Sequence, residues 1–459
     1  MLIAVARAAV ETAEAAVGRI VAAEQARFPV PGLSIGVLSS DEEWTAAFGV
    51  TSVDHPLEVT ADTYFQIGSI TKTFLGTLVM RLVEEGRLEL DAPARRWVPE
   101  LRLRDEDAAA RATLRHLLTH TCGWFGDHFA DFGPGDDCLE RYVASMADLE
   151  QQVPLGAEWA YNNAAFALAG RVVERVTGRP VEAAMRELLF APLGLARTYF
   201  FADEVVTFRV AAGHNVFDGR PRVARPWAIP RATNAVGGIV STVPELLRYA
   251  RFHMGDGRLA NGDRYLSPEG LALAHSPLVP AATGLFRGIA WSVEDTSAGR
   301  VIGHNGATIG QQALLLVAPQ RRAAVAMLTN SGQATQLQNA ITRWWRDRFL
   351  GLPYDPPTTR APSFEEAQRV AGHYVNPANE VEIRVDGGRL VFQQTLHGSL
   401  RALMEEPPPQ PAPVELAFTR ADRLIHLEGP LQDSIVELLG DPANALEWIR
   451  FGGRLYRRQ

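Results

Sequence analysis

The chain contains almost no lysine. Of its 45 basic residues, 44 are arginine, and Lys72 is the only lysine. A genome rich in G and C explains a general bias toward arginine, but it does not explain the exception. A site that needs only positive charge accepts arginine, whereas a site that must release a proton does not, because the guanidinium group stays charged in proteins. Lys72 is therefore a candidate catalytic amine.

Other absences exclude whole classes of protein. Two cysteines, Cys122 and Cys138, are too few for a disulfide framework, and no apolar run approaches the roughly 18 residues of a membrane-spanning helix. The formal net charge is −8, so neither nucleic acid nor a membrane is an expected partner. The apolar N-terminal segment is interrupted by charged residues at Arg7, Glu11 and Glu14, so we expect it to form an amphipathic helix and not a signal peptide. We therefore expect a cytoplasmic protein.

The rest of the composition, 47% hydrophobic and 21% charged, is that of a globular protein. Period-two and continuous apolar runs predict strands at residues 33–38, 44–50, 289–293, 312–317 and 323–329. Helical periodicity predicts helices at residues 71–85, 113–119, 163–177, 181–189 and 336–349. Between them, a segment rich in Gly, Asp and Phe at 123–156 is expected to wall a pocket.

A second, smaller domain is expected at the C-terminal end. Residues 351–363 contain four prolines and predict a linker after a first domain of residues 1–350. From 364 to 459, about eight short strand-like segments joined by glycine turns predict an antiparallel β-barrel. Prolines between 405 and 415 predict one long loop, and nothing in the residues decides whether the barrel reaches the first domain's pocket.

The single lysine follows a serine by three residues, in the run Ser69-Ile70-Thr71-Lys72. On a helix this spacing puts the two side chains one turn apart on the same face, so the serine hydroxyl can pass its proton to a neutral amine. The positive end of the helix dipole disfavours the ammonium form and favours an alkoxide. The alternative, a helix-capping serine beside a solvated lysine, does not explain why arginine is refused at this position.

A tyrosine and an asparagine form the second motif, Tyr161-Asn162-Asn163, just before a predicted helix. A tyrosine beside Lys72 would share a proton with it and relay that proton to a leaving group. The alternative is that Asn163 merely caps the helix.

The third motif is His304-Asn305-Gly306-Ala307, which lies between two strand-like stretches. Glycine lets the backbone run close to a bound acyl group, and a nearby backbone N–H would polarise the carbonyl of that group. The alternative is an ordinary surface histidine before a turn.

The three motifs, in this order, resemble those of the serine β-lactamases and penicillin-binding proteins, most closely the class C β-lactamase-like branch with its D-aminopeptidases and esterases. The resemblance covers roughly residues 10–350, and the tail resembles the lipocalin-like barrel appended to some members. It implies an α+β fold, in which an antiparallel sheet is flanked by helices, with an all-helical region on one side and the active site between. No cofactor and no metal are implied.

The resemblance also implies a role for each motif residue. Ser69 would be the acylated nucleophile, Lys72 would help to deprotonate it, and Tyr161 would act as general base and acid. Asn163 would hydrogen-bond the acyl side of the substrate and steady Lys72. The oxyanion hole would consist of the backbone N–H groups of Ser69 and Ala307, next to Gly306.

Two residues qualify this assignment. Lactamases of this branch usually carry lysine at the position of His304, and neutral histidine offers no fixed charge near pH 7, so we expect β-lactam hydrolysis to be weak or incidental. Trp124, at the start of the pocket segment, is a candidate substrate-binding residue, with the alternative that it only pins the loop.

We therefore expect a serine hydrolase that acts on a small ester or amide, such as a short peptide with a D-amino acid. Two alternatives keep the acyl-enzyme: transfer to an amine, as in peptide-cyclising thioesterases of this fold, and DD-carboxypeptidase activity. An alternative of another class is a non-catalytic binding or sensor module. The sequence leaves the oligomeric state open.

Overall fold

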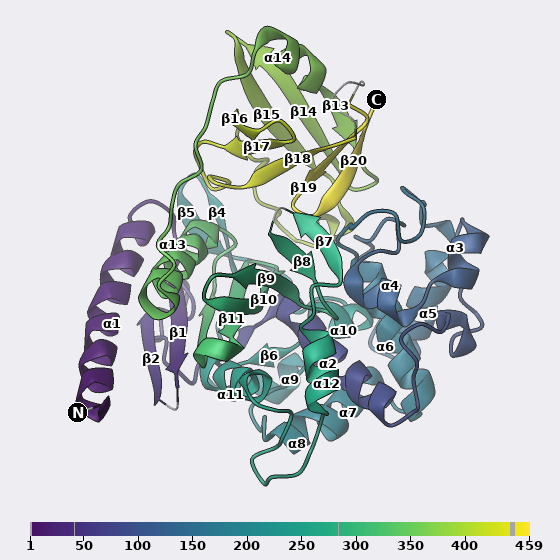
Figure 1. Cartoon of the computed structure of the whole chain (residues 1–459), viewed down its shortest axis with the longest axis vertical. Helices are drawn as coiled ribbons and strands as arrows, with labels where there is room; N and C mark the ends of the chain where they lie inside the picture. Colours follow the sequence, from purple (N-terminus) through teal and green to yellow (C-terminus); the bar gives the residue numbers. More distant parts are fainter. Residues whose placement is uncertain (1, 41, 283, 441–445) are drawn as a thin grey trace.

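The larger part of the chain is built around an eight-stranded antiparallel sheet, with a smaller β domain beside it (Figure 1). The structure is a computed structural model that describes residues 2–40, 42–282, 284–440 and 446–459. In spatial order the strands of the sheet are β2 (Glu42–Gly49), β1 (Gly32–Ser39), β12 (Ala323–Thr329), β11 (Gln311–Ala318), β10 (Gly299–Thr308), β9 (Ser292–Thr296), β8 (Leu285–Arg287) and β7 (Val279–Ala282).

The sheet brings the two ends of the larger domain together, because β1 pairs with β12 in a register that sets Ile35 opposite Met327. Both strands are apolar along nearly their whole length and buried on both faces. One face is covered by α1 (Leu2–Gln25) and α13 (Thr335–Trp345). The other face is covered by α11 (Val243–Met254) and α2 (Thr71–Glu84).

A helical region lies beside the sheet (Figure 1). The helices of this region are α3 (Glu106–Arg111), α4 (Leu114–Thr119), α5 (Cys138–Ser145), α6 (Asn163–Thr177) and α7 (Val181–Met185). Four further short helices of the larger domain are α8 (Ala191–Leu193), α9 (Ala202–Val205), α10 (Asn234–Gly237) and α12 (Pro268–Ala274). Two small strand pairs complete the domain: β3 (Phe65–Gln66) with β6 (Val240–Ser241), and β4 (His214–Phe217) with β5 (Arg220–Val223).

The C-terminal domain is a closed antiparallel barrel of eight strands, as the sequence predicted. Its strands are β13 (Gly372–Val375), β14 (Asn379–Asp386), β15 (Arg389–Leu396), β16 (Val414–Arg420), β17 (Arg423–His426), β18 (Ile435–Leu439), β19 (Trp448–Phe451) and β20 (Arg454–Arg458). The helix α14 (Phe364–Val370) packs Ala367 and Val370 against the barrel core, and α15 (Ser399–Ala402) follows β15. Residues 351–363 contain neither helix nor strand.

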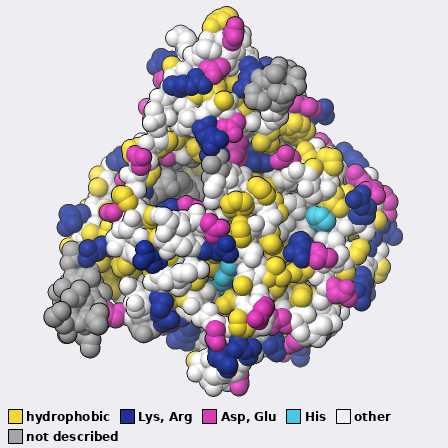
Figure 2. Space-filling view, viewed as in Figure 1, with side chains coloured by type: hydrophobic (Ala, Val, Ile, Leu, Met, Phe, Trp, Pro, Cys, Tyr) yellow, Lys and Arg dark blue, Asp and Glu magenta, His cyan; other side chains and the backbone are white. Residues whose placement is uncertain are grey.

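One local expectation needs correction. The run from His304 to Ala307 does not lie between two strands but continues β10, and β11 pairs with it as far as Thr308. On the described part of the face in Figure 2, acidic and basic side chains are interspersed, with no broad area of one sign. No described helix combines the length and the apolar character needed to cross a membrane.

Candidate active site

Ser69 and Lys72 are in contact at the start of α2. Ser69 lies in the short helix η1 (Gly68–Ile70), and Lys72 lies in the following first turn of α2. Lys72 Nζ lies 3.0 Å from Ser69 Oγ and donates to the carbonyl oxygen of Val236 at 2.9 Å. The Lys72 side chain is fully buried.

The environment of Lys72 favours the neutral amine. Burial lowers the pKa of Lys72 well below its usual value, and the positive charge of Arg454 lowers it further, while Asp127 acts in the opposite direction. A neutral amine at hydrogen-bond distance can accept the Ser69 proton, which an ammonium cannot. The geometry thus agrees with the reason that the sequence offered for a lone lysine.

Two glycines let β10 run directly against η1. Gly68 has φ of +51°, and a Cβ there would lie 2.5 Å from the backbone nitrogen of Ala307. A Cβ at Gly306 would lie 1.9 Å from the carbonyl oxygen of Ile67. Glycine at both positions therefore brings the backbone amides of Ser69 and Ala307 close together, which is the arrangement that an oxyanion hole needs.

Tyr161 lies over the amine from the opposite wall. Lys72 Nζ is 5.0 Å from the centre of the Tyr161 ring, and the His120 ring stacks on that ring at 4.4 Å. Burial raises the pKa of Tyr161 to about 12, against the effect of the neighbouring Ser69 side chain. The Tyr161 hydroxyl is buried and has no hydrogen bond of ordinary geometry to the described residues, although Ser69 is near enough to affect its pKa. It is thus protonated at neutral pH and available to a substrate.

The two asparagines of the second motif have different roles at the start of α6. Asn162, not Asn163, caps the helix, because its side chain accepts the backbone N–H of Ala165 at 2.8 Å. The capping alternative for Asn163 is therefore wrong. The Asn162 backbone N–H donates to His120 Nδ1 at 2.9 Å, which fixes the orientation of that ring.

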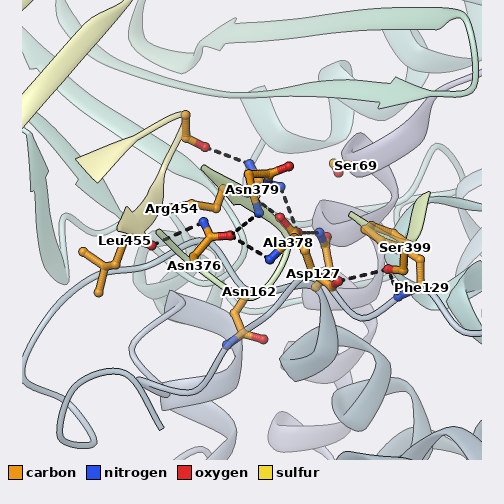
Figure 3. A network of polar contacts seen from close by, with 12 residues as sticks. Ser69, Asp127, Phe129, Asn162, Asn376, Ala378, Asn379, Ser399, Arg454 and Leu455 are labelled. Carbon is orange, nitrogen blue, oxygen red and sulfur yellow. Dashed lines mark hydrogen bonds and ion pairs between the residues drawn. The ribbon is translucent and has the colours of Figure 1, made fainter. Parts of the chain in front are cut away.

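Asp127 and Arg454 belong to a polar network beside Ser69 that sequence reasoning missed (Figure 3). The side chain of Asn163 joins this network. Asn163 Nδ2 donates to Asp127 Oδ1 at 2.6 Å, and Arg454 donates to both oxygens of Asp127 at 2.9 and 3.0 Å. Burial alone would raise the pKa of Asp127, but the charge and hydrogen bonds of Arg454 hold it below its usual value. Asn163 thus bonds to Asp127, while the amine of Lys72 is held by Val236 instead.

The barrel domain completes this site. Arg454 follows the turn between β19 and β20, and in the same turn Gly453 accepts the backbone N–H of Tyr161 at 2.7 Å. Ser399, on α15, accepts the backbone N–H of Phe129 at 2.9 Å. Nothing in the local sequence distinguishes Gly453 and Arg454 from other turn glycines and from the other arginines. Their place in the site is visible only because the barrel packs against the first domain.

The motif residues open into a cavity of about 850 Å³ between the sheet, the helical region and the barrel. Its lining includes Ser69, Tyr161, Asn163, His304, Gly306 and Ala307. Trp124 is not part of it, and the substrate-binding assignment of Trp124 is wrong. Its side chain is 1% exposed and packs in the hydrophobic core, while Phe129 and Trp159 supply aromatic surface to the cavity.

His304 is buried on β10 and neutral. Burial lowers its pKa to about 3. Its Nε2 atom has no hydrogen-bond partner within the described chain. The described residues also contain no group of three or more His, Cys, Asp or Glu side chains arranged to hold a metal ion.

Comparison with known proteins now identifies the family. The β-lactamase family model matches residues 17–347. The chain belongs to the β-lactamase family, a family of serine hydrolases. It is 36% identical over 332 residues to penicillin-binding protein 4 of Amycolatopsis lactamdurans, an alignment that covers 70% of this chain and 87% of that protein.

Two further similarities are informative. Esterase EstB of Burkholderia gladioli is 36% identical over 178 residues, which cover 36% of this chain and 44% of the esterase. The crystal structure of SurE with D-Leu superposes with a TM-score of 0.74 at 24% identity and covers 98% of this chain and 100% of that one. The second likeness shows that the arrangement of both domains, barrel included, recurs in a solved protein.

Proposed function

We propose that the chain is a serine hydrolase that forms an acyl-enzyme on Ser69 with a small ester, amide or short peptide and releases it to water. The observation that carries this proposal is the Ser69–Lys72 contact of 3.0 Å, made by a fully buried lysine whose pKa is lowered. The family's hydrolytic relatives, among them an esterase, support the same reaction class.

The proposed chemistry needs only groups of this chain. Lys72 takes the Ser69 proton as Oγ attacks the substrate carbonyl, and the backbone N–H groups of Ser69 and Ala307 stabilise the resulting oxyanion. Tyr161 gives its proton to the leaving group and regains one from Lys72. In the second half, a water molecule loses a proton to the neutral Lys72 amine as it attacks the ester carbon. Ser69 Oγ then leaves with the proton of Tyr161, and Tyr161 regains one from Lys72, which returns all three groups to their starting forms.

The site also bears on selectivity. Neutral His304 supplies no positive charge where the related lactamases usually have lysine, so β-lactam hydrolysis is expected to be weak. Transfer of the acyl group to an amine is a second candidate, for which the barrel turn beside Tyr161 offers a further wall to hold the acyl chain or the amine. Product analysis separates the two, because hydrolysis yields an acid and transfer yields an amide.

Intact-mass spectrometry with a fluorophosphonate tests the proposal. We expect one adduct on the wild type, located at Ser69 by peptide mapping, and none on Ser69→Ala. The matched control is Ser276→Ala, which removes the hydroxyl of a partly exposed serine that does not line the cavity and should label like the wild type. Labelling of Ser69→Ala, or an unlabelled wild type, contradicts an acyl-enzyme at this serine. Turnover of p-nitrophenyl esters, D- and L-amino-acid anilides and nitrocefin then ranks substrates.

A further inference from the structure

The cavity wall carries more positive than negative charge, although the chain as a whole has a net charge of −8. Four arginines and two carboxylates line it: Arg287, Arg346, Arg401, Arg454, Asp127 and Glu294. Arg454 neutralises Asp127, and Arg346 pairs with both oxygens of Glu294 at 2.7 Å. Within the described chain, Arg287 and Arg401 are left without a carboxylate, and Arg401 is partly exposed on α15.

Arg287 differs from the other three arginines, because it lies inside the cavity and no carboxylate of a described residue pairs with it. Its guanidinium donates from Nη1 to the hydroxyl of Ser292 and lies 4.3 Å from the centre of the Trp159 ring. Its Nε–H is buried and has no partner among the described residues. A buried donor of this kind costs free energy in the empty site, and a ligand acceptor would remove that cost.

The carboxylate that acts electrostatically on Arg287 is paired with other arginines. Glu437, on β18, affects the pKa of Arg287 at a distance, but it makes its own ion pairs with Arg423 and Arg450. Arg450 also bonds Glu158 at 2.7 Å. Burial consequently lowers the pKa of Arg287 to about 10, which still leaves it charged at neutral pH.

The position of Arg287 connects it to the reacting groups. Arg287 on β8 is opposite Ser292 on β9, and Ser292 is opposite Gly303 on β10. The backbone of Arg287 is therefore two strand spacings, about 10 Å, from the strand that carries His304. The charge of Arg287 is close enough to lower the pKa of Tyr161 and of His304. A ligand that reaches Ser69 can therefore extend to Arg287 within one cavity.

We propose that Arg287 is a substrate-binding residue for a carboxylate, and that substrates of this enzyme carry one. The inference rests on the proposed acyl-enzyme function and names the class of molecule that this site accepts. A guanidinium with a free Nε–H beside an apolar ring suits a planar monoanion, because Arg binds carboxylates through paired N–H donors. The anion site thus lies on β8, while the His304 position on β10 is neutral.

Matched thioesters test the inference. The first pair is hippuryl thioglycolic acid and its methyl ester, which differ only in a leaving-group carboxylate. The second pair is N-succinylglycyl and N-acetylglycyl esters of methyl thioglycolate, which differ in a carboxylate on the acyl side. The rate of thiol release gives kcat/KM for each thioester. Dividing kcat/KM of the acid by that of its neutral partner cancels any effect of a variant that is common to both substrates.

We expect the wild type to prefer the acid of one pair by at least tenfold, and the pair that shows the preference locates the carboxylate. Arg287→Met should abolish that preference and bring the acid-to-neutral ratio of kcat/KM close to one. Arg287→Lys should retain part of it, since charge remains without the paired donors. Arg111→Gln, an exposed α3 arginine far from the motif residues in the chain, is the control and should keep the wild-type ratio. No preference in the wild type, or a preference that survives in Arg287→Met, overturns the inference.

A measurement without turnover separates this inference from the proposed function. Hippurate should slow fluorophosphonate labelling of Ser69 in the wild type, and the neutral hippuramide should slow it less. The difference should vanish in Arg287→Met, with thermal unfolding used to confirm that the variant is folded. Labelling that hippurate never slows overturns the carboxylate site even though Ser69 is reactive. Absent labelling of Ser69 contradicts the proposed function instead.

Discussion

Replacing Lys72 by methionine tests whether the amine is neutral in the folded protein. Methionine is apolar and of similar length, so it fits the fully buried space that Lys72 occupies. The lost contacts with Ser69 and Val236 change stability by an amount that does not depend on pH. Acylation of Ser69 should be lost, and the difference in stability between wild type and variant should depend steeply on pH.

The size of that dependence follows from proton counting. In the unfolded chain Lys72 is protonated below about pH 10, whereas burial lowers its pKa far below this in the folded chain. In the interval between the two pKa values, the unfolded state binds one proton more, so higher pH favours the folded state. Within that interval the free energy of unfolding of the wild type should rise by about 1.4 kcal/mol per pH unit relative to Lys72→Met, or about 2.7 kcal/mol over two pH units.

Neighbouring groups of the folded site do not titrate in this interval. The pKa of His304 is lowered to about 3 and that of Tyr161 is raised to about 12. The pKa of Asp127 is lowered, and that of Arg454 is raised. The slope therefore reports Lys72 itself.

Urea unfolding followed by circular dichroism at pH 7.5, 8.5 and 9.5 measures the difference. Lys72→Arg is the control, because its guanidinium is charged in both states and should give a flat difference against Lys72→Met. A flat difference for the wild type would show that Lys72 is charged when folded. The amine could then not accept the Ser69 proton, and the proposed mechanism would be refuted.

Three other substitutions give direct tests. Arg454→Met should destabilise the protein by about 3 kcal/mol in urea unfolding, because it leaves Asp127 buried without its ion pair; an unchanged midpoint would show that the pair contributes little. Gly306→Ala should slow fluorophosphonate labelling at least tenfold, because its Cβ would lie 1.9 Å from the Ile67 carbonyl oxygen; wild-type labelling would disprove the tight approach of β10. His304→Lys should raise nitrocefin hydrolysis, and equal rates would show that this residue does not set the selectivity.

Local sequence patterns identified most of what lies within one element. Ser69 and Lys72 are three residues apart on a helical turn, so their contact is fixed by helical geometry and needs no distant partner. The eight-stranded barrel was likewise predictable from the glycine turns between short apolar runs. Errors arose where a residue's environment is set by packing: Trp124 looks like a loop aromatic in sequence and is a core residue in three dimensions.

The amino-acid sequence by itself determined the reactive pair, the order of the three motifs and the division into a sheet-based domain and a barrel, because each depends on short-range periodicity or on one lysine among arginines. Only the tertiary structure decided which charges meet. Asp127 and Arg454 are separated by 327 residues and form one ion pair. Among the described residues Arg287 has no carboxylate partner, since Glu437 and Glu294 are paired with other arginines. Burial and pairing are properties of the packed molecule, and no local run of residues encodes them.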